Sequence, residues 1–157
     1  MKIILETDRL ILREMTEEDD FFMYDLLNSD GWLEFIGDRN IKTVEDARNH
    51  ILNNYIKMYE THGFGLWVVV RKSDSTCIGT CGLIKRPSLA DVDIGFAFLS
   101  EYMGEGYAYE AATASMNYGY EVMDMNRIVA ITIPENKRSI HLLQKLVIQF
   151  ALTVYGL

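Results

Sequence analysis

The chain has 157 residues, of which 49% are hydrophobic and 24% are charged, and its formal charge is −8. This length predicts a single domain, residues 1–157, with a core large enough to enclose a site. The composition excludes a disordered or fibrous protein, and no apolar run is long enough to span a bilayer. An acidic residue follows the N-terminus too soon for a signal peptide, and two isolated cysteines, Cys77 and Cys81, fit a reducing cytoplasm.

The negative charge is concentrated in the first part of the chain. Residues 1–62 hold seven basic and fourteen acidic residues, which leaves the remainder close to neutral. The sequence has no basic stripe of the kind that nucleic acids require. Two interpretations stay open: the acidic part attracts a cationic substrate, or it is the solvated face of helices, which is the commoner case.

Local patterns predict alternating strands and helices. Acidic residues follow Thr16 and Thr43, which is typical of helix starts. The expected elements are, in order, a strand at 9–13, helices at 16–29 and 43–63, strands at 64–71, 76–85 and 92–99, a helix at 106–123, a strand at 127–133, a helix at 136–146 and a strand at 148–155. This order, β-α-α-β-β-β-α-β-α-β, predicts an α/β (α+β) domain whose mixed, mostly antiparallel sheet is flanked by helices.

The most informative segment joins a strand to a helix through Gly104-Glu105-Gly106. Glycines let backbone amides approach a ligand, and a helix N-terminus offers unpaired N–H groups, so this turn suits a pyrophosphate. A dinucleotide fingerprint would need Gly or Ala at Tyr109, and a P-loop would need Gly-Lys-Ser/Thr. An ordinary glycine turn is the alternative.

The context of this turn is similar to a known family. The segment Gly104–Ala111 resembles the acyl-CoA-binding motif of the GNAT superfamily of N-acetyltransferases, in particular its RimJ/RimL-type branch. Three other segments, Glu6–Arg13, Asp93–Phe96 and Asn136–Leu146, resemble that branch's first strand, its fourth strand and its Asn-x-x-Ser helix, in the same order. The resemblance implies a GNAT fold and an acetyl-CoA-dependent enzyme that acetylates a primary amine, either a protein N-terminus or a small amine.

The resemblance also implies a set of cofactor-binding residues. The backbone of Phe98 and Leu99 would pair with the pantetheine arm where two neighbouring strands splay apart. Asn136 would hydrogen-bond the pantetheine, and Ser139 would lie near the thioester. The pyrophosphate would be held by backbone amides of Met103, Gly104, Glu105, Gly106, Tyr107 and Ala108.

The catalytic groups are less clearly marked. Asp93 matches an acid that precedes Ile-Gly in this branch and is our candidate for the general base; a carboxylate that merely closes a hairpin is the alternative. Many GNAT enzymes place a tyrosine acid where this chain has Leu143, so proton donation to the thiolate falls to Ser139, to water or to no group.

The acceptor side is expected around Trp32 and Glu34, by the same resemblance. Glu34 would then meet a cationic amine. Lys137 and Arg138 are close enough in sequence to the helix start to offer a cation to a phosphate, or else form a solvated pair. His50, His62, His141 and the two cysteines lack the spacing of metal ligands.

The C-terminal segment departs from the family pattern. After Leu146 the family continues with a glycine and two more strands, whereas only one strand fits here, so the family's last strand is expected to be missing. An unpaired apolar strand invites another chain, which predicts a homodimer through this segment. The alternative explanation of the missing strand is a truncated or altered chain.

The alternative functions are a non-catalytic acyl-CoA-binding protein and a plain interaction domain.

Overall fold

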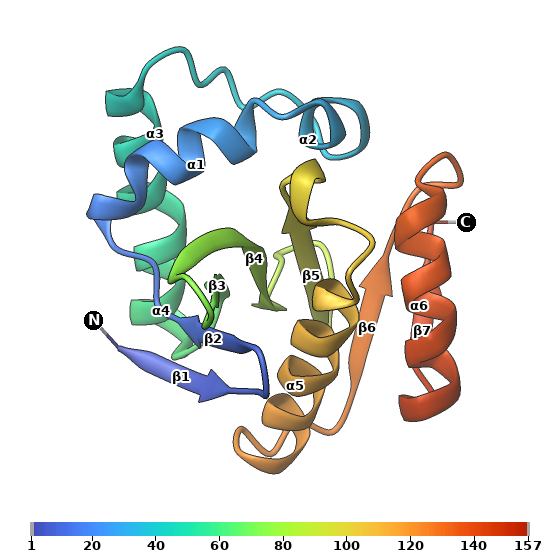
Figure 1. Ribbon diagram of the computed structural model, residues 1–157. Helices are drawn as coiled ribbons and strands as arrows, with labels where there is room; N and C mark the ends of the chain where they lie inside the picture. The colour runs from blue at the N-terminus through green and yellow to red at the C-terminus, as the bar shows by residue number, and fades with distance from the viewer. Residues whose placement is uncertain (1, 157) are drawn as a thin grey trace.

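The structure, a computed structural model, describes residues 2–156, with one sheet and helices on both of its faces (Figure 1). The strands are β1 (Ile3–Glu6), β2 (Leu10–Arg13), β3 (Leu66–Arg71), β4 (Thr76–Ile84), β5 (Val92–Phe98), β6 (Ile128–Ile131) and β7 (Thr153–Tyr155). The helices are α1 (Asp20–Leu27), α2 (Asp30–Phe35), α3 (Val44–His50), the π-helical η2 (Ile51–Ile56), α4 (Lys57–His62), α5 (Tyr107–Glu121) and α6 (Lys137–Phe150), with 3-10 turns η1 (Glu17–Asp19) and η3 (Ser100–Tyr102).

The seven strands lie in the order in which they occur in the chain, β1-β2-β3-β4-β5-β6-β7. The pairings from β1 to β5 are antiparallel, and β5–β6 and β6–β7 are parallel. The predicted mixed, mostly antiparallel sheet is therefore confirmed. The β5–β6 pairing is short, since it contains only Val92 with Ile128 and Asp93 with Val129, so the two strands separate after Asp93.

Helix α5 packs closely on one face of the sheet because its inner side consists of small residues. Ala111, Ala112 and Ser115 are fully buried, and Ser115 Oγ lies 3.5 Å from Cys81 Sγ of β4. A Cβ at Gly119 would come within 2.7 Å of the Ile128 side chain. These small residues let α5 approach the sheet closely, with the start of the helix beside the end of β5.

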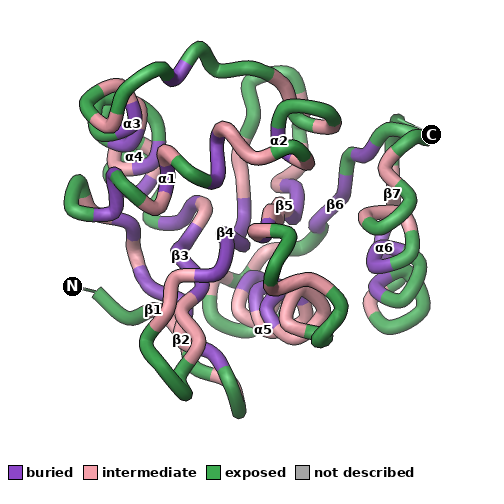
Figure 2. Tube along the Cα trace, turned by 45° about the horizontal axis from the view of Figure 1, so that its top comes forward, coloured by how far each residue is buried: buried purple, intermediate pink, exposed green. Residues whose placement is uncertain are grey.

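The opposite face is covered by α3, η2 and α4, which follow one another without a break. Ile51, Tyr55 and Tyr59 recur every four residues and are buried, and Figure 2 shows buried and exposed stretches alternating along the α3–α4 segment. The helix predicted at 43–63 is thus confirmed, and Gly63 ends it with a left-handed φ of 78°. The wider π-helical turn was not predicted; such turns are frequent at functional sites.

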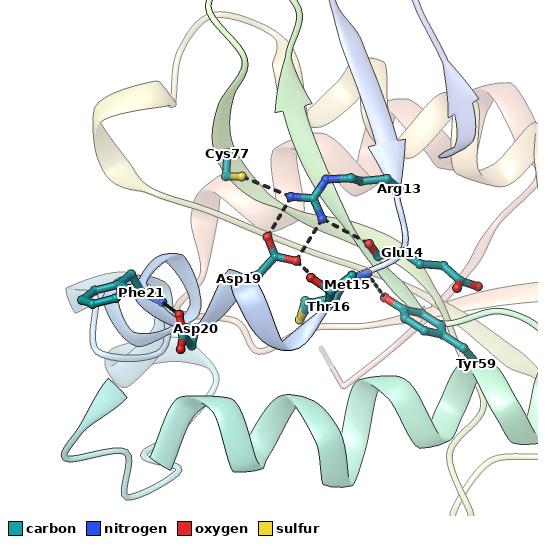
Figure 3. A network of polar contacts seen from close by, with 9 residues as sticks. All are labelled: Arg13, Glu14, Met15, Thr16, Asp19, Asp20, Phe21, Tyr59 and Cys77. Carbon is teal, nitrogen blue, oxygen red and sulfur yellow. Dashed lines mark hydrogen bonds and ion pairs between the residues drawn. The ribbon is translucent and has the colours of Figure 1, made fainter. Parts of the chain in front are cut away.

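A buried ion pair joins β2 to the start of the first helical region (Figure 3). Arg13 Nη2 and Nη1 donate to Asp19 Oδ1 and Oδ2 at 2.7 and 2.9 Å, and both residues are only 7% exposed. Asp19 Oδ2 also accepts the Thr16 backbone N–H at 2.8 Å. Both charged groups of the pair are therefore hydrogen-bonded, which is what a buried charge requires.

Two short elements were not predicted, and one strand was predicted wrongly. β1 and α2 are additional to the expected order. The helix expected to end at Leu146 continues to Phe150, so the strand expected at 148–155 shrinks to β7. Phe150 stacks on Tyr120 of α5, with ring centroids 6.2 Å apart, and this packing outweighs the β-branched residues Val147 and Ile148. Ala151 ends the helix with φ 53°.

β7 is the last strand at its edge of the sheet within residues 2–156. It pairs with β6 on one side only, so pairing of a second chain at this edge stays a prediction, which light scattering at micromolar concentration would test. Among the described residues, no helix is both long and apolar enough to cross a membrane.

Candidate functional site

The separation of β5 from β6 leaves backbone groups without a partner. Leu99 N–H donates to the Ile78 carbonyl of β4 at 3.0 Å, and peptide groups along a strand point alternately to its two sides. The backbone groups of Phe98 and Phe96 therefore face β6, with which they form no ladder pair. Leu99 is already satisfied, because its carbonyl accepts the Tyr102 N–H at 3.0 Å. Of the two residues expected to bind a pantetheine arm, only Phe98 offers backbone groups for it.

The glycine turn leads directly into α5. Gly104 and Gly106 have φ of 85° and 82°, a left-handed conformation that glycine adopts without strain. The first backbone bond of the helix runs from Glu110 N–H to the Gly106 carbonyl at 3.1 Å, and no side chain caps the N-terminus. The N–H groups of Tyr107, Ala108 and Tyr109 therefore point out of the helix end, where the helix dipole favours an anion.

Arg9 holds this turn in place from β2's side. Its Nη1 donates to the Glu105 carbonyl at 2.9 Å, its Nε donates to Glu110 Oε1 at 2.8 Å, and its guanidinium lies 4.4 Å from the ring centroid of Tyr107. Glu110 Oε2 accepts the Thr7 hydroxyl at 2.5 Å and the Arg9 backbone N–H at 3.0 Å. These contacts lower the pKa of Glu110 against the opposing effect of burial, which is the larger single influence.

A cavity of about 750 Å³ lies in front of the turn, between α2, β5, α5 and the start of α6. Its lining includes Met103, Gly104 and Gly106–Tyr109 on one side, and Phe96–Phe98 at its inner end. Helix α6 adds three cations to the wall, Lys137, Arg138 and Lys145. Because an uncapped helix N-terminus and three cations face one cavity, this space suits a phosphorylated ligand with an extended arm. We call it the donor cavity.

A second cavity of about 510 Å³ lies on the face of the sheet covered by η2 and α4. We call it the acceptor cavity. The two cavities share part of their walls, so they meet. The shared residues come from α2, from the unpaired part of β5 and from the start of α6: Trp32, Phe35, Ile36, Phe96, Ala97, Asn136 and Ser139.

The start of α6 brings two polar side chains to this junction. Asn136 Oδ1 accepts the Ser139 backbone N–H at 3.2 Å and so caps the helix, which leaves the Asn136 amide Nδ2 to donate to a ligand. The Thr132 hydroxyl, on a residue only 7% exposed, donates to Ser139 Oγ at 3.2 Å. This contact orients the Ser139 hydroxyl and leaves its own proton for another acceptor.

Asp93 lies in the wall of the acceptor cavity, just where β5 and β6 separate. It is 1% exposed, and Arg86 Nε donates to its Oδ1 and Oδ2 at 3.1 and 3.3 Å. Burial raises the pKa of Asp93, and the Arg86 charge opposes this shift only in part. A buried carboxylate with a raised pKa is a better proton acceptor than an ordinary aspartate.

Three residues predicted for the site lie outside both cavity linings, and so does Leu143. Leu99 is satisfied by β4, Glu105 contributes only its carbonyl to Arg9, and Glu34 is exposed on the outer side of α2. The cavity linings therefore give no support to a contact of Glu34 with an amine, which stays a prediction. Leu143 is a core residue, 2% exposed, so no acid stands at that position.

Other residues at the site were missed by the sequence analysis. Arg9 lies in the segment that resembles the family's first strand, but no role was assigned to it, and Thr132 carried no signal beyond lying in a predicted strand. Arg39, His50 and Tyr55, which line the acceptor cavity, lie far from the recognised motifs in the sequence.

Neither cysteine is placed to act as a nucleophile. Cys81 is fully buried, and this burial raises the pKa of its thiol to about 12. Burial also raises the pKa of Cys77, and neither residue lines a cavity. Within residues 2–156, no group of three His, Cys, Asp or Glu side chains is arranged to hold a metal ion.

Comparison with known proteins decides the family. Residues 9–147 match the family model described as an acetyltransferase (GNAT) domain. The chain belongs to the GNAT acetyltransferase family. It is an N-acetyltransferase, as its relatives are, and the resemblance to the RimJ/RimL-type branch is confirmed.

The relatives cover nearly the whole chain. The uncharacterized N-acetyltransferase p20 of Bacillus licheniformis is 30% identical, over 92% of this chain and 82% of its own length. The [ribosomal protein uS5]-alanine N-acetyltransferase of Escherichia coli is 27% identical, over 92% and 77%. Among solved structures, a GNAT-family acetyltransferase from Bacillus anthracis is 28% identical with a TM-score of 0.74, over 93% of this chain and 82% of that one.

Two further structures agree in fold. An acetyltransferase from Agrobacterium tumefaciens has a TM-score of 0.78 at 21% identity, over 93% and 82% of the two chains. RimL, a ribosomal L7/L12 alpha-N-protein acetyltransferase solved in complex with coenzyme A, has a TM-score of 0.76 at 18% identity, over 92% and 82%. The GNAT enzymes thus share the sheet that creates both cavities.

Proposed function

We propose that this GNAT enzyme transfers the acetyl group of acetyl-CoA directly to a primary amine at the junction of the donor and acceptor cavities. The observation that carries the proposal is the uncapped N-terminus of α5, which faces a cavity that extends to the unpaired edge of β5. Phosphate binding at a helix N-terminus and an extended arm along a strand edge are the two needs of a coenzyme A ester.

The donor cavity has a partner for each part of such a ligand. The amides of Tyr107, Ala108 and Tyr109 would hold the pyrophosphate, with Lys137 and Arg138 supplying opposite charge. The peptide groups of Phe96 and Phe98 and the Asn136 amide would bind the pantetheine arm. The thioester would then lie beside Ser139, at the junction of the cavities.

The transfer needs one bond to form and one to break. The amine nitrogen attacks the thioester carbonyl carbon, the C–S bond breaks, and the amine gives up a proton while the thiolate takes one. Backbone N–H groups that face the gap beside β5 would stabilise the negative charge that develops on the carbonyl oxygen. No covalent protein intermediate is required, in keeping with two cysteines that line neither cavity.

Two side chains are proposed to move the protons. Asp93, on the acceptor side, would take the amine's proton directly or through a water. Ser139 would relay a proton to the thiolate: its hydroxyl proton passes to the sulfur while its Oγ regains one from water, and the Thr132 hydroxyl, which donates to that Oγ, holds it in place. Ser139 thereby takes the role that a tyrosine at Leu143 would have in other members of the family.

The names of two relatives indicate the class of acceptor to expect. One acts on the alanine of ribosomal protein uS5, by its name, and spermidine N(1)-acetyltransferase of Escherichia coli matches a shorter stretch, 39% identical over 46 residues. Both acceptors are amines. A protein N-terminus and a small amine are therefore the two acceptor types proposed for this chain.

Calorimetric titration with acetyl-CoA, followed by release of coenzyme A across an amine panel, tests this function. We expect saturable binding and protection of the amides of residues 96–109 and 136–139 from hydrogen exchange. Binding without turnover of any amine would favour a non-catalytic acyl-CoA-binding protein, and absence of binding would refute the proposal.

A further inference from the structure

The wall of the acceptor cavity is unevenly charged. Three cationic side chains line it, Arg39, Lys85 and Arg86, and Asp93 is the only carboxylate among its described lining residues. The whole chain has the opposite balance, with a formal charge of −8. The charge of the cavity is therefore a local feature that the overall composition conceals.

None of the three cations is fully neutralised. Asp93 contacts only Nε of Arg86, so the two terminal nitrogens of that guanidinium remain available, and the side chain is 43% exposed. The Lys85 ammonium donates to the carbonyls of Arg86 and Leu89, which carry no net charge. Arg39 forms no ion pair with any residue in the described part of the chain.

The histidine in this wall adds a donor without adding charge. Burial, and then the charge of Arg39, lower the pKa of His50 and so favour its neutral imidazole. Asn54 Nδ2 lies 3.1 Å from His50 Nδ1 and 3.0 Å from the His50 carbonyl. An amide nitrogen only donates, so Nδ1 accepts and the ring proton is on Nε2.

The acidic residues of the first part of the chain lie outside the acceptor cavity. Of the fourteen in residues 1–62, only Asp30 lines a cavity, and that is the donor cavity. Glu34 lines neither. The acidic part of the chain is thus mostly solvated surface, and a polyamine would meet like charges in the acceptor cavity.

We propose that the acceptor is a small amine that also carries an anionic group, a carboxylate or a phosphate, bound by Arg39 and the terminal nitrogens of Arg86. This inference rests on the proposed acetyl transfer. Guanidinium groups match both anions with paired hydrogen bonds. The same cations disfavour the ammonium form of the acceptor and so raise the fraction of reactive neutral amine.

The size and lining of the cavity favour a small molecule. At about 510 Å³ it is at the lower end of ligand pockets. The aromatic rings of Trp32, Phe35, Tyr55 and Phe96 line it together with the cations. These walls would pack on a short carbon chain between the amine and the anionic group.

The test compares kcat/KM at saturating acetyl-CoA for three sets of amines of matched length. One set carries a carboxylate or a phosphate, one is uncharged apart from the amine, and one consists of diamines and polyamines. We expect the anionic set to be favoured by roughly tenfold or more, because hydrogen bonds to charged groups are the stronger ones. The carboxylate and phosphate arms of the first set distinguish the two anions.

Arg39→Gln is the informative variant, because Arg39 is exposed and forms no ion pair within residues 2–156, so its loss should not disturb the fold. It should lower kcat/KM for anionic amines about tenfold, mainly through KM, and lower it much less for uncharged amines, so that the preference for the anionic set shrinks. Lys42→Gln is the matched control, because Lys42 is an exposed cation three residues away that lines neither cavity.

The outcomes separate this inference from the proposed function. Absence of acetyl-CoA binding would refute the function itself. Binding of acetyl-CoA with a preference for polyamines, or an Arg39→Gln variant that keeps the preference for anionic amines, would overturn the inference alone. If no amine turns over, titration of the anionic set into the complex with coenzyme A decides, and lack of binding there overturns it.

Discussion

Replacing Gly104 with alanine tests whether the turn before α5 holds the pyrophosphate. Gly104 has φ 85°, and a Cβ there would meet no atom within 4 Å, so the substitution adds backbone strain without a clash. A residue with a side chain costs roughly 1–2 kcal/mol in the left-handed region. The exposed turn relaxes locally in the unliganded protein, so ligand binding must restore the strained form. We therefore expect the Kd for acetyl-CoA to rise about 5- to 30-fold.

Gly63→Ala is the matched control for this strain. Gly63 has φ 78°, also has an open space at its Cβ, and ends α4 away from both cavities. The same strain should there lower the thermal stability and leave the Kd unchanged. Calorimetric titration and thermal unfolding of both variants give the two quantities. Wild-type affinity in Gly104→Ala, or equal weakening in both variants, would refute the role assigned to the turn.

Three further predictions concern the charged and buried groups. Asp93→Asn removes the proposed general base and should lower kcat by about a hundredfold or more, with little change in acetyl-CoA affinity. Asp91→Asn is the control and should leave kcat unchanged, because it breaks only a pair with Arg127 outside the cavities. Equal kcat values for the two variants would rule out Asp93 as the base. Burial raises the pKa of Tyr55 to about 12, so the unfolded chain loses this proton at lower pH than the folded one. The free energy of unfolding should therefore fall by about 3 kcal/mol as the pH rises from about 10 to about 12. Urea unfolding of Tyr55→Phe should show a smaller fall over this pH range, and an unchanged fall would contradict the assignment. Asp19→Asn leaves the Arg13 charge buried without its partner and should lower the free energy of unfolding by about 3–5 kcal/mol; a loss below about 1 kcal/mol would show that the pair is not buried as described.

The sequence predicted those elements whose local pattern and packing agree. The glycine turn before α5, the small-residue face of that helix and the three antiparallel strands before it all follow from residue type and spacing. The C-terminal segment was predicted wrongly because Val147 and Ile148 favour a strand locally, while contact of Phe150 with Tyr120 extends the helix. Such a contact joins residues far apart in the chain, so no local pattern reports it.

The site was predicted on the donor side and missed on the acceptor side for the same reason. Backbone amides at a helix start follow from a short motif, and the motif is visible in the sequence. The acceptor wall combines Arg39, η2 and the β4–β5 hairpin, and these meet only after the sheet forms. The net charge of residues 1–62 left a cationic substrate open as one of two interpretations, whereas the charged residue of this part that reaches the acceptor cavity, Arg39, is itself a cation.

A single-turnover reaction with acetyl-labelled acetyl-CoA tests the central claim most directly. The enzyme in excess is mixed with the labelled ester and an anionic amine, and the label is followed on amine and protein. Direct transfer predicts that labelled amide appears at the rate at which coenzyme A is released, and that denatured protein from any time point carries no covalently attached label. Label that passes through the protein, or coenzyme A released without labelled amide, would contradict the account.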